Sequence, residues 1–365
     1  MTGQQSTAEQ LMDRFLERYR PEHALTLDFG GHVTRVESNS KALLDKLHRY
    51  FRDFLASGVI PPAPQTVVTA LEAPPPAPED LDLVFAAKQP DPGKTKIKEE
   101  YVNLPHGRAV RKRLTGMLFV FGGGRHMAVG PCLANDNQVV NFINNRFIEW
   151  ILDQGALLFH AAGVARHGGD AGLALAGFSG MGKSTLALHI MRLDADFVSN
   201  DRLMVRRDAQ QLTMYGVAKM PRINPGTVLN NPNLASVAPA EELERFRALP
   251  IAELWALEHK YDAFIDECFG PGRFRLKASM AGLVLLNWRR DDSAPLAMRR
   301  VDLAARRDLM PAFMKSVGLF YDPDKEIDPD FSEDAYLELL ADCPVYEVSG
   351  AVDFAAAAQA CRDLL

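Results

Sequence analysis

The spacing of hydrophobic residues predicts a helix and then a hairpin at the start of the chain. Apolar side chains recur every four positions from 11 to 19, behind Thr7 and Gln10, a pair typical of a helix-capping box. Ranges 24–29 and 33–37 have the composition of two short strands, and the two glycines between them favour a tight turn. Residues 1–37 therefore read as one helix followed by a β-hairpin.

Helical spacing returns over 43–55, behind two serines of which either could cap the helix. Two proline runs then fall within 61–80, and proline at this density forms a semi-rigid spacer. We therefore expect a small N-terminal α/β domain over residues 1–60, a linker over 61–80 and a second domain over 81–365.

The second domain opens with strand patterns and continues as mixed α/β. The expected strands are 81–85, 96–104, 108–121, 126–129, 156–164 and 171–176, with a helix at 137–152. The triple glycine at 122–124 could be a nucleotide loop or a hairpin turn. No helical pattern follows it, which favours the turn.

Composition narrows the class of protein. Of 365 residues, 47% are hydrophobic and 24% charged, as in globular proteins, and the net charge of -6 argues against a nucleic acid or an anionic membrane as partner. Apolar runs are too short to span a bilayer, and no export signal is recognised. Four cysteines without a C-x-x-C pair fit reduced thiols. We expect a cytoplasmic protein, with a homo-oligomer left open.

The most specific feature is the run GFSGMGKS at 177–184, which fits the phosphate-binding pattern G-x-x-x-x-G-K-[ST]. An apolar strand precedes it and a helix follows, so backbone amides and a helix N-terminus would face the phosphates of ATP. The alternative is a chance glycine-rich turn. The expected nucleotide-binding residues are Gly177, Ser179, Gly180, Met181, Gly182, Lys183, Ser184 and Thr185.

An acidic residue follows the next short strand. Asn200 and Asp201 lie seventeen and eighteen residues after Lys183, with room for one helix between. In phosphate-loop sites such an Asp orients Mg²⁺ beside the loop Ser184. The alternative is an Asn-Asp surface turn.

Three further candidates have a structural alternative each. His160 lies among apolar residues in a predicted strand, where a lone histidine is usually structural. Arg222 and Asn224 lie between prolines on a stiff segment, and either bind the substrate or only shape a turn.

Segments 160–166, 173–185 and 197–203 together resemble the HPr kinase/phosphorylase family, whose catalytic fold is similar to that of phosphoenolpyruvate carboxykinase. The resemblance implies a P-loop kinase domain with a mixed sheet flanked by helices. It also implies that His160 is a catalytic-site residue, that Lys183 binds phosphate, and that Ser184 and Asp201 bind the metal. Asn200 occupies the position of the family's catalytic base, and an amide cannot accept the proton.

Segments 219–226, 258–260 and 345–353 resemble a divergent subgroup, the HPr kinase-related kinases of the B type. The resemblance covers about 135–365 and does not extend to the N-terminal part, so the family's protein substrate is not implied.

We therefore expect an ATP- and Mg²⁺-dependent kinase that transfers the γ-phosphoryl group to a hydroxyl of a small molecule or a protein. A protein serine kinase is one alternative, and an ATP-binding regulatory or assembly module with weak ATPase activity is another. The proton of the attacking hydroxyl would go to His160, to Asp201, or to no base at all, since loose phosphoryl transfer demands little nucleophilic push.

Overall fold

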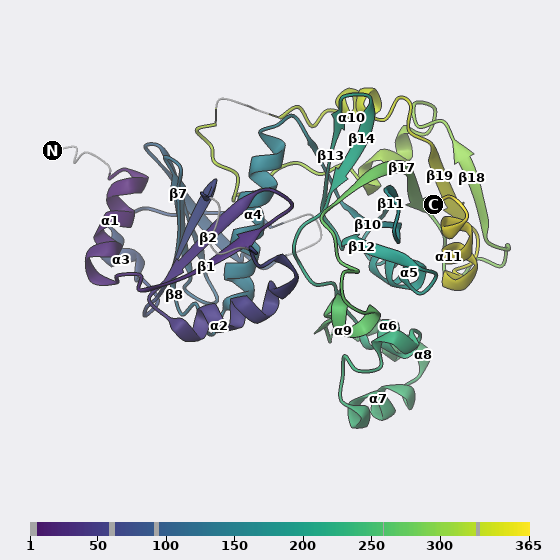
Figure 1. The fold of residues 1–365 in the computed structure, drawn as a ribbon, viewed down its shortest axis with the longest axis horizontal. Helices are drawn as coiled ribbons and strands as arrows, with labels where there is room; N and C mark the ends of the chain where they lie inside the picture. Colours follow the sequence, from purple (N-terminus) through teal and green to yellow (C-terminus); the bar gives the residue numbers. More distant parts are fainter. Residues whose placement is uncertain (1–5, 58–62, 91–94, 258, 326–328) are drawn as a thin grey trace. The chain divides into compact units, whose positions relative to one another are not determined.

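The computed structural model describes residues 6–57, 63–90, 95–257, 259–325 and 329–365. The chain forms two compact units (Figure 1). Unit 1 comprises Met1–Trp150 and Val317–Asp328, and unit 2 comprises Ile151–Ser316 and Pro329–Leu365.

Unit 1 has, in its described part, an eight-stranded sheet of order β1-β2-β3-β8-β7-β6-β5-β4. Its strands are β1 (His23–Asp28), β2 (Val33–Ser38), β3 (Thr66–Glu72), β4 (Ala86–Ala87), β5 (Glu99–Leu104), β6 (Gly107–Lys112), β7 (Leu118–Gly122) and β8 (Arg125–Gly130). Its helices are α1 (Ala8–Arg18), α2 (Lys41–Tyr50), η1 (Arg52–Phe54), α3 (Pro78–Leu81) and α4 (Asp136–Leu152).

The two faces of this sheet are covered by different elements. Thr7 and Gln10 form the predicted capping box of α1, whose apolar side packs with Leu118 and Val120 of β7. The intervening Phe119 points to the opposite face and meets the ring of Phe142 in α4, 5.0 Å away. Alternate residues of one strand thus hold both layers of the unit together.

The expected domain boundary is wrong. Strand β3 lies between β2 and β8 and runs parallel to both, so the expected N-terminal domain and the strands after residue 81 share one sheet. The alternating apolar residues of Thr66–Glu72 form a buried strand, although proline runs flank it. Residues 61 and 62 of the expected linker lie outside the described residues.

Two predicted strands also need correction. Range 81–85 is not a strand, because Pro78 begins a short helix that ends at Leu81. Range 108–121 is two strands, β6 and β7, separated by a turn near Gly116, whose φ is 69°. The hairpin turn at the triple glycine is confirmed, since Gly122 pairs with Arg125.

Unit 2 contains, among the described residues, a mixed nine-stranded sheet. The order is β12-β10-β11-β17-β14-β13-β9, with β19 beside β17 and β18 beside β19. The strands are β9 (Leu157–Phe159), β10 (Ala161–Arg166), β11 (Ala171–Gly177), β12 (Ala195–Ser199), β13 (Leu203–Asp208), β14 (Gln211–Tyr215), β17 (Lys277–Leu286), β18 (Ala297–Val301) and β19 (Val345–Ser349).

Helices flank this sheet, and a helical group is inserted between β14 and β17 (Figure 1). The helices are α5 (Lys183–Met191), α6 (Pro225–Leu229), η2 (Pro232–Leu234), α7 (Ala240–Arg247), α8 (Ile251–Ala256), α9 (Ile265–Phe269), η3 (Arg307–Ala312), α10 (Glu333–Leu339) and α11 (Phe354–Arg362). A two-stranded sheet of β15 (Arg222–Ile223) and β16 (Tyr261–Asp262) spans the base of the insertion.

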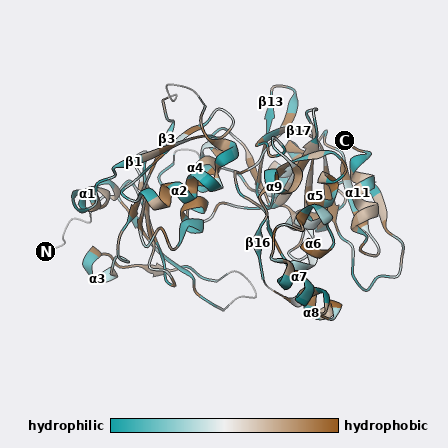
Figure 2. Cartoon of the chain, turned by 60° about the horizontal axis from the view of Figure 1, so that its bottom comes forward, coloured by the Kyte–Doolittle hydropathy of each residue, from teal (hydrophilic) through white to brown (hydrophobic). Residues whose placement is uncertain are grey.

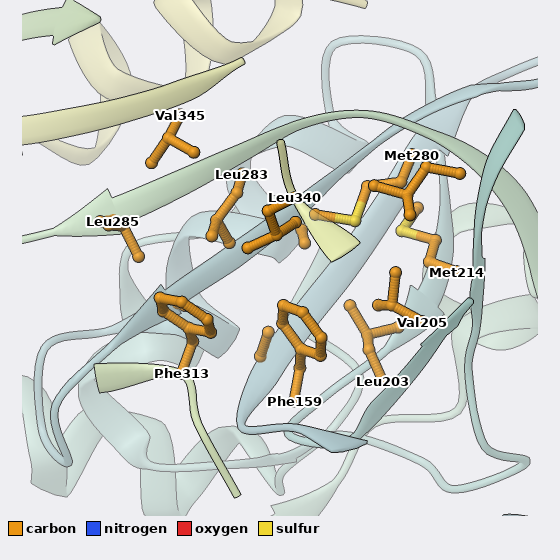
Figure 3. Packing of buried hydrophobic residues seen from close by; sticks show 14 of the residues in the cluster. Phe159, Leu203, Val205, Met214, Met280, Leu283, Leu285, Phe313, Leu340 and Val345 are labelled. Carbon is orange, nitrogen blue, oxygen red and sulfur yellow. The ribbon is translucent and has the colours of Figure 1, made fainter. Parts of the chain in front are cut away.

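Two apolar clusters bury the faces of the unit 2 sheet. Ala174 and Ala176 of β11 face a cluster in which the rings of Phe159 and Phe313 stack 5.3 Å apart (Figure 3). Leu175 faces the other cluster, beneath α5 and α11. In Figure 2, α5 and the strands beside it are mainly hydrophobic, whereas α7 is largely hydrophilic. The strand before the glycine-rich run is therefore held on both sides.

Among the helices that the structure describes, none combines the length and the apolar character needed to cross a membrane.

Candidate functional site

The sheet register brings three predicted segments to one edge. Ala161, the first residue of β10, pairs with Ala176 near the end of β11. Gly163 of β10 pairs with Ser199, the last residue of β12. His160, the loop after Gly177 and the Asn200-Asp201 pair therefore leave the sheet at the same edge, although up to about forty residues separate them in the sequence.

His160 does not lie in the middle of a strand, as predicted, but between two strands. β9 pairs with β13, whereas β10 pairs with β11 and β12, so the chain changes partners at this residue. The backbone N–H of His160 donates to the carbonyl of Phe313 at 2.7 Å. Because His160 belongs to neither strand, its imidazole does not follow the alternation of side chains between the two faces of the sheet. It lies half-buried at the sheet edge.

Two aromatic residues pack against the loop at 177–182 and support its backbone. The indole N–H of Trp288 donates to the carbonyl of Met181 at 2.9 Å, and the rings of Trp288 and Phe354 lie 5.0 Å apart. Gly182 has φ 86°, and a Cβ there would lie 2.6 Å from Phe354. Only glycine fits this position without displacing the ring. Ser179 and Gly180 form the exposed tip of the loop.

Lys183 is the first residue of α5 and is only 8% exposed. Its ammonium donates to the carbonyl of Gly177 at 2.7 Å and, more weakly, to that of Phe178 at 3.5 Å. Burial lowers the pKa of Lys183, and the charge of Asp201 opposes this effect. A buried cation whose hydrogen bonds go to neutral carbonyls beside a helix N-terminus is suited to a phosphate.

Ser184 and Thr185 continue the first turn of α5, and both are half-buried. The Thr185 hydroxyl bonds the hydroxyl of Thr227 in α6 at 2.8 Å, which ties the inserted helical group to the loop helix. The expected role of Thr185 in nucleotide binding stays a prediction, and its backbone amide lies in the first turn of α5.

The turn that carries Asn200 and Asp201 is closed by Ser199, whose hydroxyl donates to the carbonyl of Arg202 at 2.5 Å. The side-chain oxygen of Asn200 is buried and has no hydrogen-bond partner among the described residues. A buried acceptor without a donor is unfavourable, so this oxygen is suited to a donor on a bound molecule.

The charges around His160 are mainly positive. Burial lowers the pKa of His160 to about 4, and the charges of Lys183, Lys315 and Arg202 act in the same direction. Asp201 opposes them. His160 is therefore neutral at pH 7 and able to accept a proton, but it is a weaker base than an ordinary histidine.

Lys219 and Lys315 were not predicted as site residues. Among charged groups, Asp201 has the largest effect on Lys219, and Lys315 acts on both His160 and Lys183. Lys219 lies in the segment 219–226, which resembles the B-type subgroup, so the sequence could have indicated Lys219 as a site residue. The sequence did not indicate Lys315, because only packing between distant segments brings this residue close to His160.

Arg222 is exposed, and its guanidinium lies 3.5 Å from a carboxylate oxygen of Asp262. Asn224 precedes α6, and its buried side-chain oxygen has no hydrogen-bond partner among the described residues. Both residues thus lie shortly before Thr227, whose hydroxyl contacts Thr185 of α5. Glu258, in the segment 258–260, lies outside the described residues.

A metal could be shared between this edge and a nucleotide. No group of three or more His, Cys, Asp or Glu side chains suited to a metal is found in the part of the chain that the structure describes. Mg²⁺ in phosphoryl-transfer sites is usually bound by one or two protein oxygens together with phosphates. Ser184 and Asp201 fit that arrangement in donor type.

No family model matches the chain. No curated protein matches it either. Among solved structures, the Hpr(Ser) kinase/phosphatase from Coxiella burnetii is similar with a TM-score of 0.27 and 12% identity, over 54% of this chain and 79% of that one. This TM-score is too low to support an inference on fold or function, so the chemistry of the site rests on the chain's own residues.

Proposed function

We propose that this protein is an ATP-dependent kinase that transfers the γ-phosphoryl group to a hydroxyl. The observation that carries the proposal is Lys183, buried at the start of α5 within a complete phosphate-loop sequence and hydrogen-bonded to carbonyls of that loop. Asp201 and His160 adjoin the same sheet edge, which supports a reaction at the end of a bound triphosphate.

The proposed role of each site residue follows from the chemistry of its side chain or backbone. Loop amides, the N-terminus of α5 and Lys183 would bind the phosphates. Mg²⁺, held by Ser184 and Asp201, would neutralise charge on the triphosphate. His160, neutral at pH 7, would accept the proton of the attacking hydroxyl, and the unpartnered oxygen of Asn200 would accept a hydrogen bond from another donor group of the acceptor molecule.

A second candidate function is nucleotide binding without phosphoryl transfer. The amide at Asn200 is the observation that favours it, since an amide supplies no general base. Such a protein would be an ATP-binding regulatory or assembly module with slow hydrolysis. Stimulation of ADP release by an acceptor distinguishes a kinase from this module. The acceptor itself is either a small molecule or a protein serine.

The proposal is tested by titrating ATP into the Lys183→Ala variant by calorimetry. Loss of a charged hydrogen-bond donor should weaken ATP binding by about 10- to 100-fold. Lys277→Ala is the matched control, because Lys277 is exposed at the opposite end of β17 from Leu286, the residue that pairs with Gly177. ATP affinity of Lys183→Ala within threefold of the parent protein would refute the proposed site.

A further inference from the structure

Most carbonyl groups of the loop at 177–182 accept hydrogen bonds within the protein. Lys183 donates to two of them, and the backbone of α5 donates to a third. The Met181 carbonyl instead accepts from a side chain outside the loop, the indole N–H of Trp288, at 2.9 Å. These carbonyls are therefore already bound and turned away from any ligand of the loop.

The amide groups of the same loop are available to a ligand. Among the described residues, no hydrogen bond is donated by the backbone N–H groups of Ser179, Gly180 and Gly182. Backbone N–H groups carry positive partial charge, and several of them in succession form a concavity that binds anions. A loop with bound carbonyls and free amides is therefore suited to phosphate, provided that the amides face it.

The bond from Trp288 fixes the direction of one of these amides. The carbonyl of Met181 and the N–H of Gly182 belong to the same peptide unit, which is planar and trans. In such a unit the two groups point in nearly opposite directions. Trp288 is only 2% exposed, so a carbonyl held by its indole aims the Gly182 N–H away from the buried side of the loop.

Trp288 is itself held firmly. The residues directly before and after it donate backbone hydrogen bonds to the carbonyls of Val348 and Gly350, at 2.8 and 3.0 Å. Its ring meets the ring of Phe354 edge-on, with centroids 5.0 Å apart and an angle of 83° between the planes. A donor that is already fixed needs little further ordering when the loop binds a ligand.

We propose that Trp288 is a positioning residue for the nucleotide, which acts through the Met181 carbonyl to hold the Gly182 amide toward a phosphate of ADP or ATP. This inference rests on the proposed nucleotide site. Backbone amides of a phosphate loop bind the α- and β-phosphates, which both nucleotides carry, so Trp288 contributes equally to the binding of ADP and ATP. A phosphate that accepts from Gly182 polarises the peptide unit, and this strengthens the bond between its carbonyl and the indole.

The first test removes the indole N–H and keeps an aromatic ring. Trp288→Phe should weaken MgADP and MgATP binding by a similar factor, about three- to tenfold, when both are titrated by calorimetry. Trp150→Phe is the matched control, because it makes the same chemical change in unit 1, where Trp150 lies against the ring of His32. The control should change neither affinity.

The second test observes the indole N–H directly and gives a readout that packing alone would not change. The chain has three tryptophans, so a ¹H–¹⁵N spectrum contains three indole signals, and the one absent from Trp288→Phe belongs to Trp288. MgADP should move this signal downfield, because the bond to the Met181 carbonyl becomes stronger, whereas adenosine, which has no phosphate, should not move it. If circular dichroism shows that Trp288→Phe does not fold, Trp150→Phe and Trp255→Phe assign the other two signals and identify that of Trp288 by elimination.

Three results would overturn the proposal while leaving the nucleotide site intact. They are an indole signal of Trp288 that stays in place when MgADP binds, unchanged affinity of a folded Trp288→Phe for both nucleotides, and a loss of affinity for MgATP but not for MgADP. Failure of the parent protein to bind either nucleotide would instead refute the proposed function, and this inference with it.

Discussion

We predict that a bound triphosphate raises the pKa of His160. In the free protein burial and the charges of Lys183, Lys315 and Arg202 lower this pKa from 6.5 to about 4. Phosphates beside Lys183 would neutralise part of that positive field, while the effect of burial would remain. The pKa of His160 in the complex should therefore lie between about 4 and 6.5.

The direction in which activity depends on pH follows from the proposed role of His160 as a general base. A general base works only when it is unprotonated, so activity is lost as the pH falls through the pKa of His160. The profile of kcat/KM for ATP reports the free enzyme and should fall near pH 4, whereas the profile of kcat reports the complex and should fall at higher pH. Proton uptake on MgATP binding at pH 5 is measured by calorimetry in buffers of different ionisation enthalpy, and it should be about 0.4 proton for a pKa of about 5 in the complex and about 0.9 proton for a pKa of about 6.5.

His160→Gln supplies the control. The variant should lose the acidic limb in both profiles, lose the difference in proton uptake, and turn over about 10²- to 10⁴-fold more slowly with ATP affinity unchanged. Proton uptake by the ATP phosphates themselves is the same in both proteins and cancels in the difference. Turnover within threefold of the parent protein, with the limb still present, would exclude His160 as the base.

Further variants test the metal, the residue at position 200 and the loop. Ser184→Ala and Asp201→Asn should each lower Mg²⁺-dependent activity strongly, and the double variant should be little worse than the poorer single one, whereas multiplicative losses would show separate functions. Asn200→Asp should raise turnover if the chain is a weakened kinase, and should leave it unchanged or lower it if His160 is the base. Gly182→Ala should lower the free energy of unfolding by more than Gly180→Ala, for which about 1–2 kcal/mol is expected. Both glycines have positive φ, but a Cβ at Gly180 meets nothing within 4 Å, so equal losses in thermal melts would contradict the close packing beneath the loop.

The sequence predicted well what depends on neighbouring residues. The capping box of α1, the hairpin at the triple glycine and the order of strand, glycine-rich run and helix at β11 and α5 are all confirmed as elements. Each is specified by side chains within a few positions of one another. Their functional roles stay predictions, because the residues that would bind nucleotide and metal are recognised by motif alone.

Interactions between distant segments were not predictable in this way. The apolar run around His160 is continuous in sequence, so nothing local shows that β9 and β10 pair with different strands. Strand β3 was not predicted because the proline runs on both sides of it are typical of an extended spacer. Lys315 reaches the site only through the packing of Tyr336 and the bridge at Met314, which a periodicity argument cannot find.

The amide at position 200 affects the charge around His160. An aspartate in place of Asn200 would add a second negative charge beside Asp201, and would offset part of the field of Lys183, Lys219 and Lys315. With an amide there, the field stays strongly positive, which weakens His160 as a base in the free protein and strengthens the attraction for an anion. Binding of the triphosphate would then offset part of this field and restore part of the basicity of His160. The amide at position 200 thus leaves His160 dependent on the bound phosphates for its basicity, and Asn200→Asp should accordingly raise the pKa of His160 in the free protein, seen as a shift of the acidic limb of kcat/KM to higher pH.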